Sequence, residues 1–149
     1  MAKRATANRL PAKPSLRRTA DRLWSLAVRD DWASKCAVCG NPKCEAHHLI
    51  PRGNYATRYL IANGIALCFT HHKADDAIAP HCNAAGWMEW LEENTTDRAQ
   101  WYRDHKWDKF SGIKTQSYFV DRINDLREYF EPHEFADIVG PILLGHLGE

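Results

Sequence analysis

The chain has 149 residues, 44% of them hydrophobic and 26% charged, and this length suits one compact domain with a substantial core. No apolar run approaches the ~20 residues that cross a bilayer, and no apolar stretch follows the basic start as in a secretory signal. We therefore expect a cytoplasmic protein that does not span a membrane. Its five cysteines then indicate metal or redox chemistry rather than a disulfide framework.

The charge is distributed unevenly along the chain. Residues 1–20 contain six basic and no acidic side chains, whereas the remaining 129 residues have a balance of −5, which leaves an overall charge of +1. Two prolines and the lack of hydrophobic periodicity predict a flexible basic arm over residues 1–14. Such an arm adds affinity for phosphates through counterion release, and the alternative is a solvated tail without a partner.

The first half of the chain predicts a helix followed by a Cys- and His-rich unit. Apolar residues at helical spacing predict the helix over residues 15–31. Residues 36–83 are interrupted by Gly and Pro, which favours a small unit of short strands and loops stapled by a metal. We expect strands over residues 45–50 and 63–67, and a further helix that begins at His72.

The second half of the chain is mainly helical in this interpretation. The first helix and the Cys/His-rich unit form one segment, 15–83, and residues 84–149 form an aromatic-rich helical region packed on the same domain. One helix is expected over about 114–129, and the apolar last segment, 135–147, is expected to pack back onto the body. The aromatic stripes are most simply explained as core.

Two pairs of metal-binding side chains share the same two-residue gap. Cys36 and Cys39 form one pair, and Cys68 and His71 form the other. Together they make a closed tetrahedral Cys3His set, which is typical of a structural zinc site. Cys44 is the alternative fourth ligand in place of His71, although a small buried thiol is the favoured role. A thioredoxin-like redox site is disfavoured because no βαβ pattern surrounds the pair.

Further histidines and carboxylates lie within the same segment. His47 and His48 are neighbours in a predicted strand, so their side chains point to opposite faces and can serve different partners. In the predicted helix, Asp75 and Asp76 return to the same face as His72. The pattern therefore places both strand histidines, His72 and one aspartate beside the zinc unit.

This constellation resembles a known family. His48, Asn63 and His72, flanked by Cys36-x-x-Cys39 and Cys68-x-x-His71, resemble the motif of HNH (ββα-metal) endonucleases over residues 36–76. With its flanking helices the chain is similar to small phage and prophage members, including the NinG-like recombination nucleases. His71 stands where many members have a fourth cysteine. The resemblance implies an α+β fold with a small zinc-stapled, treble-clef-like core between mostly helical N- and C-terminal segments.

The resemblance also implies roles for individual residues. His48 would be the general base that takes a proton from the attacking water. His47 and His72 would bind a catalytic divalent cation. Asn63 would hold the loop between the strands so that His48 points correctly. His48, Asn63 and His72 thus form the expected catalytic set.

The remaining ligands and substrate contacts are less defined. The third ligand of the catalytic metal stays open between Asp76 and Asp75, and a mixed histidine–carboxylate set would accept Mg²⁺, Mn²⁺, Ni²⁺ or Zn²⁺. His81 is a further candidate ligand or phosphate contact, with an ordinary loop histidine as the favoured interpretation. Basic residues near the motif and the first helix are candidate contacts to the DNA backbone. They are Arg17, Arg18, Arg52, Arg58 and Lys73.

The resulting expectation is a DNA endonuclease that uses one divalent metal and a histidine base, in a bacterial host cell if the chain is phage-encoded. Two alternatives stay open: a structure-selective junction resolvase or nickase of the same fold, and a non-catalytic zinc module that binds nucleic acid. The aromatic C-terminal half would complete the DNA surface, bind a packaging or recombination protein, or form core. The residues predict no oligomeric state.

Overall fold

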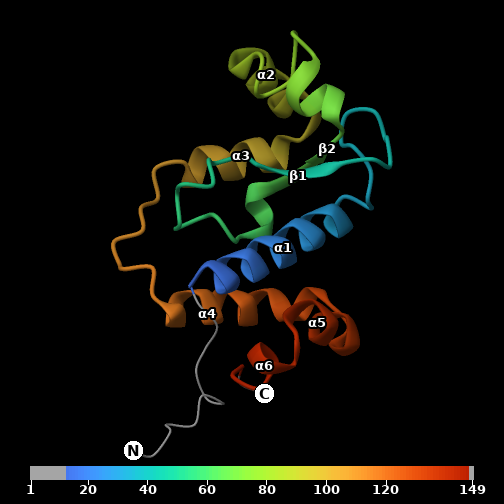
Figure 1. The fold of residues 1–149 in the computed structure, drawn as a ribbon. Helices are drawn as coiled ribbons and strands as arrows, with labels where there is room; N and C mark the ends of the chain where they lie inside the picture. Colours follow the sequence, from blue (N-terminus) through green and yellow to red (C-terminus); the bar gives the residue numbers. More distant parts are fainter. Residues whose placement is uncertain (1–12, 148–149) are drawn as a thin grey trace, which may run out of the picture. The chain divides into compact units, whose positions relative to one another are not determined.

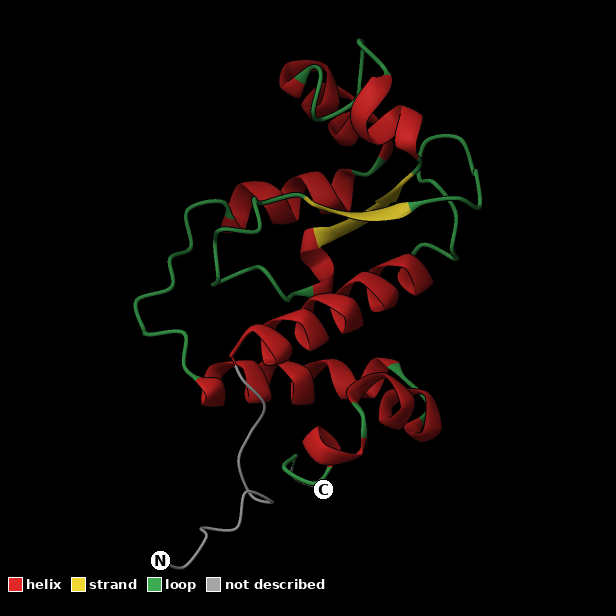
Figure 2. Ribbon diagram, in the orientation of Figure 1, coloured by secondary structure: helices red, strands yellow, loops and turns green. Residues whose placement is uncertain are grey.

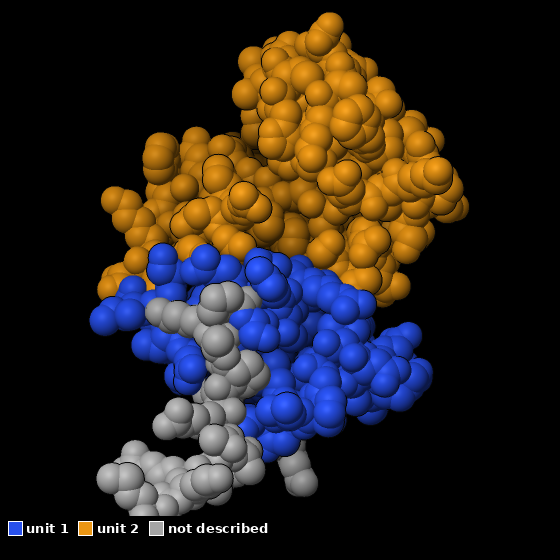
Figure 3. Space-filling model, in the orientation of Figure 1, with its two compact units in different colours: residues 1–23, 112–149 blue, residues 24–111 orange. Residues whose placement is uncertain are grey.

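The computed structural model describes residues 13–147, which form helices and one two-stranded sheet (Figures 1 and 2). The expected α+β class is confirmed at this level. The chain divides into two compact units (Figure 3). Unit 2 spans residues 24–111, and unit 1 combines residues 1–23 with 112–149. No helix within the described residues is both long and apolar enough to cross a membrane.

The sheet of unit 2 is an antiparallel pair of short strands. β1 (Glu45–His48) pairs with β2 (Gly64–Leu67), so that Glu45 lies opposite Leu67 and His48 opposite Gly64. All four residues of β2 are buried, whereas β1 is partly exposed. The strand expected over residues 45–50 thus ends two residues early, at His48.

The helix α1 (Lys13–Asp31) contributes its last turns to unit 2 and packs closely on the hairpin. A Cβ atom on Gly64 would lie 2.3 Å from Val28 Cγ2 and 3.0 Å from Trp24 Cζ2. Just beyond the helix, Trp32 Nε1 donates a hydrogen bond of 3.1 Å to the Gly64 carbonyl. Only glycine fits at this position, because the helix approaches the strand without space for a side chain.

Short helices and a tight loop complete unit 2. A Cβ atom on Gly86 would lie 1.9 Å from the Ala77 carbonyl oxygen, so the loop after β2 also approaches a helix where only glycine fits. The hydrophobic core contains Ile65, Leu67, Trp87, Leu91 and Ala99, together with Cys36, Leu49 and Cys68. The further elements of this unit are η2 (Ile61–Asn63), η3 (Thr70–Ala74), α2 (Ala84–Asn94) and α3 (Thr96–His105).

The described residues of unit 1 form helices joined by short loops. The helix expected over 114–129 is present as α4 followed by a short 3₁₀ turn, and the expected segment 135–147 supplies buried apolar residues. The elements of unit 1 that follow residue 111 in the chain are α4 (Gln116–Leu126), η4 (Arg127–Tyr129), α5 (Pro132–Val139) and α6 (Pro141–Leu144). Residues 1–12 of the expected basic arm lie outside the described residues. Its last two residues, 13 and 14, belong to α1, which begins at Lys13.

The two compact units do not follow the segment boundary expected at residues 83 and 84. The segment 84–111, which contains α2 and α3, belongs to the same compact unit as the hairpin. Residues 112–147 belong with the first turns of α1. The reason is visible in the core of unit 2, where Trp87 and Leu91 from α2 pack with Ile65 and Leu67 from β2.

The close approach at Gly64 predicts the effect of one added methyl group. In Gly64→Ala, the new Cβ overlaps the Val28 side chain, so we expect the free energy of unfolding to fall by about 1–3 kcal/mol. Gly53→Ala is the matched control, since a Cβ atom there meets nothing within 4 Å. Urea unfolding followed by circular dichroism measures both variants. Equal midpoints for the two would contradict the packing described for α1.

Candidate metal centres

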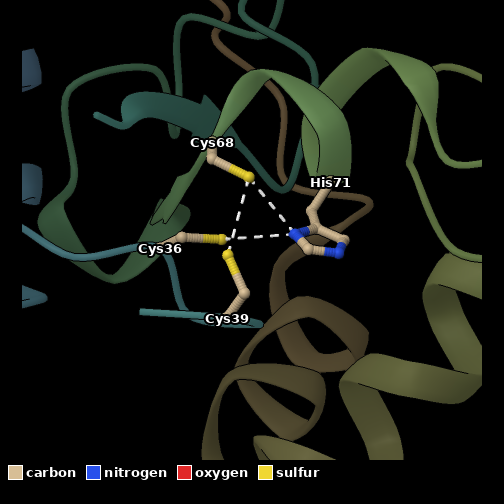
Figure 4. Close-up of side chains that lie close together, drawn as sticks. All are labelled: Cys36, Cys39, Cys68 and His71. Carbon is tan, nitrogen blue, oxygen red and sulfur yellow. Dashed lines mark hydrogen bonds between the residues drawn. The ribbon is translucent and has the colours of Figure 1, made fainter. Parts of the chain in front are cut away.

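Four predicted ligands come together at the start and end of the hairpin (Figure 4). Cys36 and Cys39 lie in the turn before β1, Cys68 directly follows β2, and His71 lies in η3. Sγ atoms of Cys39 and Cys68 are 3.8 Å apart, and His71 Nδ1 lies 3.2 Å from Cys68 Sγ and 3.8 Å from Cys36 Sγ. We call this set the Cys3His cluster.

These separations can be compared with those of a bound ion. Tetrahedral bonds of about 2.3 Å to sulfur and about 2.0–2.1 Å to nitrogen place two sulfurs about 3.8 Å apart, and a sulfur and a nitrogen about 3.6 Å apart. The observed sulfur–sulfur distance is 3.8 Å, and the observed sulfur–nitrogen distances are 3.2 and 3.8 Å. The Cys3His cluster is therefore compatible with a structural metal ion.

Backbone hydrogen bonds in this cluster favour the thiolate form of Cys36. Burial opposes ionisation of the Cys36 thiol, but backbone N–H groups of Cys68, Cys39 and Val38, together with the His71 side chain, lower its pKa to about 6. A metal needs the thiolate, so this environment favours binding. Cys44 is not part of the cluster, and burial raises its pKa. His71 therefore supplies the fourth ligand position.

A second group of ring nitrogens forms where β1 faces η3. His47 Nδ1 and His81 Nε2 each lie 3.1 Å from His72 Nε2. These three residues form the three-histidine cluster, with one ligand atom from each ring within 4.8 Å of the others. A ring nitrogen with one lone pair cannot accept two full hydrogen bonds, so the arrangement suits a shared cation better. Bonds of zinc length would separate two nitrogens by about 3.3 Å.

Burial disfavours the charged forms of His47 and His72 in this second cluster. Burial, followed by repulsion from His72, His81 and His48, lowers the pKa of His47 to about 3. Burial is also the main cause that lowers the pKa of His72, while Glu45 opposes this shift. Neutral imidazole is the form that binds a metal ion. Protonation therefore competes with a cation only weakly at His47.

The two aspartates expected as ligands do not belong to this cluster. The helix that would return them to the face of His72 ends at Ala74, and Asp75 has an extended backbone. Asp75 Oδ1 instead accepts hydrogen bonds from the backbone N–H groups of Ala77 and Ile78, at 2.8 and 3.2 Å. Asp76 is exposed. His81, rather than either aspartate, is thus the third member of this cluster.

The sequence favours His81 as an ordinary loop histidine, with a metal ligand or phosphate contact as the alternative. The signal that places it is the turn at Asp75, whose side chain bonds the backbone two and three residues on and so reverses the chain. The reversal is closed by a backbone hydrogen bond of 3.4 Å from the His81 N–H to the His72 carbonyl.

His48 occupies a different environment from its neighbour. Its ring stacks on Trp24, with centroids 3.7 Å apart and an interplanar angle of 7°. His48 Nε2 donates a hydrogen bond of 3.0 Å to the Arg58 carbonyl. Because a carbonyl only accepts, Nε2 carries the proton and Nδ1 is the basic nitrogen. The alternation expected along β1 is present, since His47 meets the other histidines and His48 meets Trp24.

Asn63 holds the loop between the strands from a fully buried position. Its Oδ1 accepts a hydrogen bond of 2.7 Å from the Ile50 N–H. Its Nδ2 donates to the carbonyls of Ile50 and Thr57, both at 3.1 Å. The side chain thus joins two distant points of the loop that presents the Arg58 carbonyl to His48.

The basic residues singled out in the sequence lie in different settings. Arg58 is only 8% exposed, and its Nη1 donates to the Arg52 carbonyl at 2.9 Å. Its role is therefore internal to the loop, which corrects the expected DNA-backbone contact. Arg52 and Lys73 are exposed in unit 2. Arg17 and Arg18 are exposed on the part of α1 that belongs to unit 1.

The Cys3His cluster predicts unequal effects of two exposed cysteines. Cys39→Ser removes one ligand, so we expect loss of bound metal and a decrease in unfolding free energy of about 4 kcal/mol or more. Cys82→Ser is the matched control, because Cys82 is equally exposed and lies outside the cluster. Elemental analysis and thermal unfolding measure the two effects. Full metal content in Cys39→Ser would remove Cys39 from the ligand set.

The three-histidine cluster predicts which residue supplies its third ligand. His81→Ala removes one of three nitrogens, and we expect Co²⁺ affinity at this cluster to fall at least about 10-fold. Asp76→Ala is the control, since the exposed Asp76 lies outside the cluster and should leave the affinity unchanged. Titration with Co²⁺, followed by its visible absorption, distinguishes them. The reverse order of effects would restore the aspartate as ligand.

Comparison with known proteins adds no relative to this picture. No family model, curated protein or solved structure matches the chain. The chemistry of the two clusters is therefore inferred from their own residues, distances and surroundings.

Proposed function

We propose that this chain is a metal-dependent endonuclease of the HNH type that hydrolyses phosphodiester bonds in DNA. The observation that carries the proposal is that two neighbouring histidines of β1 have different surroundings. His47 belongs to a three-nitrogen cluster suited to a cation, and His48 is held next to it as an oriented base. A metal site beside a histidine base can supply the electrostatic stabilisation and the general base for hydrolysis of a phosphodiester.

The finer fold assignment is part of this proposal. A turn with two cysteines precedes β1, the hairpin follows, and Cys68 and His71 lie at the entry to η3. This order supports a ββα-metal, treble-clef-like core. Three thiolate ligands and one imidazole favour zinc, and a set closed by four protein ligands has a structural rather than a catalytic role.

The ligand type of the second cluster bears on the choice of cation. Three imidazoles leave coordination positions for phosphate oxygens or water, as in catalytic sites with three protein ligands. Nitrogen ligands suit Zn²⁺ and Ni²⁺ best, whereas Mg²⁺ and, to a lesser degree, Mn²⁺ prefer oxygen. With Asp75 and Asp76 outside the cluster, the reason to expect Mg²⁺ is weakened. When bound, the cation would polarise the scissile phosphate and stabilise charge on the leaving oxygen.

His48 takes the proton from the attacking water in this mechanism. Nδ1 is the accepting atom, because Nε2–H is donated to the Arg58 carbonyl. As the ring becomes positively charged, the same carbonyl stabilises it by a stronger hydrogen bond. Trp24 restricts the tilt of the ring by stacking on its face, and Trp24 Nε1 is itself held by the Leu60 carbonyl at 2.9 Å.

Asn63 acts indirectly, through the loop that orients His48. It holds the loop whose Arg58 carbonyl orients His48, so it is a positioning residue. DNA as the substrate is supported by the exposed basic residues Arg52 and Lys73, which lie in the same unit as the two clusters. They would bind the backbone without reading its sequence.

Cleavage of supercoiled plasmid tests the function and the role of His48. With Ni²⁺, Mn²⁺ or Zn²⁺ we expect nicked or linear product, and His48→Ala should be slower by about 10²–10⁴-fold because the base is lost. Both clusters should still bind metal in this variant, since His48 is in neither. His133→Ala, an exposed histidine of unit 1, is the control and should cleave normally.

The form of the product, or its absence, distinguishes the possible functions in this experiment. Nicked circles indicate a nickase, and cleavage confined to branched DNA indicates a junction resolvase. No product with any of these metals, from folded and zinc-containing protein, would overturn the nuclease and favour a nucleic-acid-binding module. Cleavage by His48→Ala at the wild-type rate would remove His48 as the base.

A further inference from the structure

The two ring nitrogens of His72 have different surroundings. Nε2 faces His47 and His81 in the three-histidine cluster. Nδ1 is buried, and within residues 13–147 it has no hydrogen-bond partner. A neutral ring that offers the lone pair of Nε2 must carry its proton on Nδ1, so this buried N–H needs an acceptor.

A carboxylate lies beside this nitrogen. Glu45 Oε2 is 3.6 Å from His72 Nδ1, slightly farther than a hydrogen bond, and 3.8 Å from Lys73 Nζ. Lys73 is a cation and cannot accept the proton. The Asp75 carboxylate is held by the backbone N–H groups of Ala77 and Ile78, and the ion pair at His72 Nδ1 is with Glu45. Glu45 is therefore the acceptor that the described chain places at His72 Nδ1.

The strand explains why one glutamate reaches this position. Glu45 and His47 are two residues apart in β1, so their side chains leave the same face of the strand. His47 approaches His72 at Nε2, and Glu45 approaches the same ring at Nδ1. One face of β1 thus contacts both ends of a single imidazole that comes from η3.

We propose that Glu45 is a positioning residue for the metal ligand His72, and that its carboxylate accepts the Nδ1–H and directs the Nε2 lone pair into the three-histidine cluster. This inference rests on the proposed function in one respect, namely that a divalent cation binds this cluster. Such carboxylate–histidine–metal arrangements fix the tautomer and ring orientation and strengthen the ligand. The carboxylate also adds a negative charge near three neutral ligands.

Because Glu45 is exposed, its carboxylate carries little desolvation cost, and substitutions at this position can be compared without a change in the fold. Its side chain is 54% exposed, so the charge remains hydrated and the residue is not part of the core. Substitutions there should leave the fold and the Cys3His cluster intact, because exposed ion pairs contribute little to stability. Thermal unfolding of each variant checks this.

The experiment measures Co²⁺ binding to the full chain with the Cys3His cluster already filled with zinc. Glu45→Ala should weaken Co²⁺ binding at the three-histidine cluster by about 10–100-fold. Glu45→Gln should lose less, because its amide oxygen still accepts the Nδ1–H although the charge is gone. Glu93→Ala is the matched control, since it removes an exposed glutamate that lies outside the cluster and should leave binding unchanged.

A second readout separates positioning from a general charge effect. In ¹⁵N spectra of the cobalt-free protein, His72 should be the Nδ1–H tautomer in wild type and in Glu45→Gln, and a mixture of tautomers in Glu45→Ala. Equal Co²⁺ affinity of wild type and Glu45→Ala overturns the inference and leaves the proposed function standing. A wild-type chain that binds no Co²⁺ beyond the Cys3His cluster overturns both.

Discussion

A hairpin of two four-residue strands is only marginally stable in water, so unit 2 depends on what ties its hairpin to the rest of the chain. One tie is the close packing of α1 at Gly64, and the other is the Cys3His cluster. The cluster joins the turn before β1 to the end of β2 and to η3, and two of its cysteines lie in the hydrophobic core. A bound ion would therefore stabilise the same core that positions the histidines.

Residue spacing predicted the parts of the site that depend on short, regular geometry. The pairs Cys36/Cys39 and Cys68/His71 meet because each is a single turn, and His47 and His48 diverge because neighbouring residues of a strand point to opposite faces. The pattern likewise predicted α1 over residues 15–31 and the helical nature of the C-terminal half. In each case the local rule and the tertiary structure agree.

The features that the sequence did not predict depend on irregular backbone. Asp75 was assigned to a helix face, but its side chain caps a turn, and that turn brings His81 into the three-histidine cluster. Arg58 was assigned to the surface, yet it is buried, and its carbonyl matters more than its charge because it orients His48. A backbone carbonyl has no residue-type signature, and an aspartate is equally compatible with a helix face and with a turn, so the sequence alone did not decide either feature.

The register of β1 has a consequence for how strictly this arrangement is specified. Shifting β1 by one residue against β2 would exchange the faces of His47 and His48, so the candidate base would point at the cation cluster and the ligand at Trp24. The pairing of His48 with Gly64 opposes such a slip, because the space beside Gly64 admits no side chain and α1 already fills it. A glycine without chemistry of its own thereby keeps two chemically identical side chains in different roles.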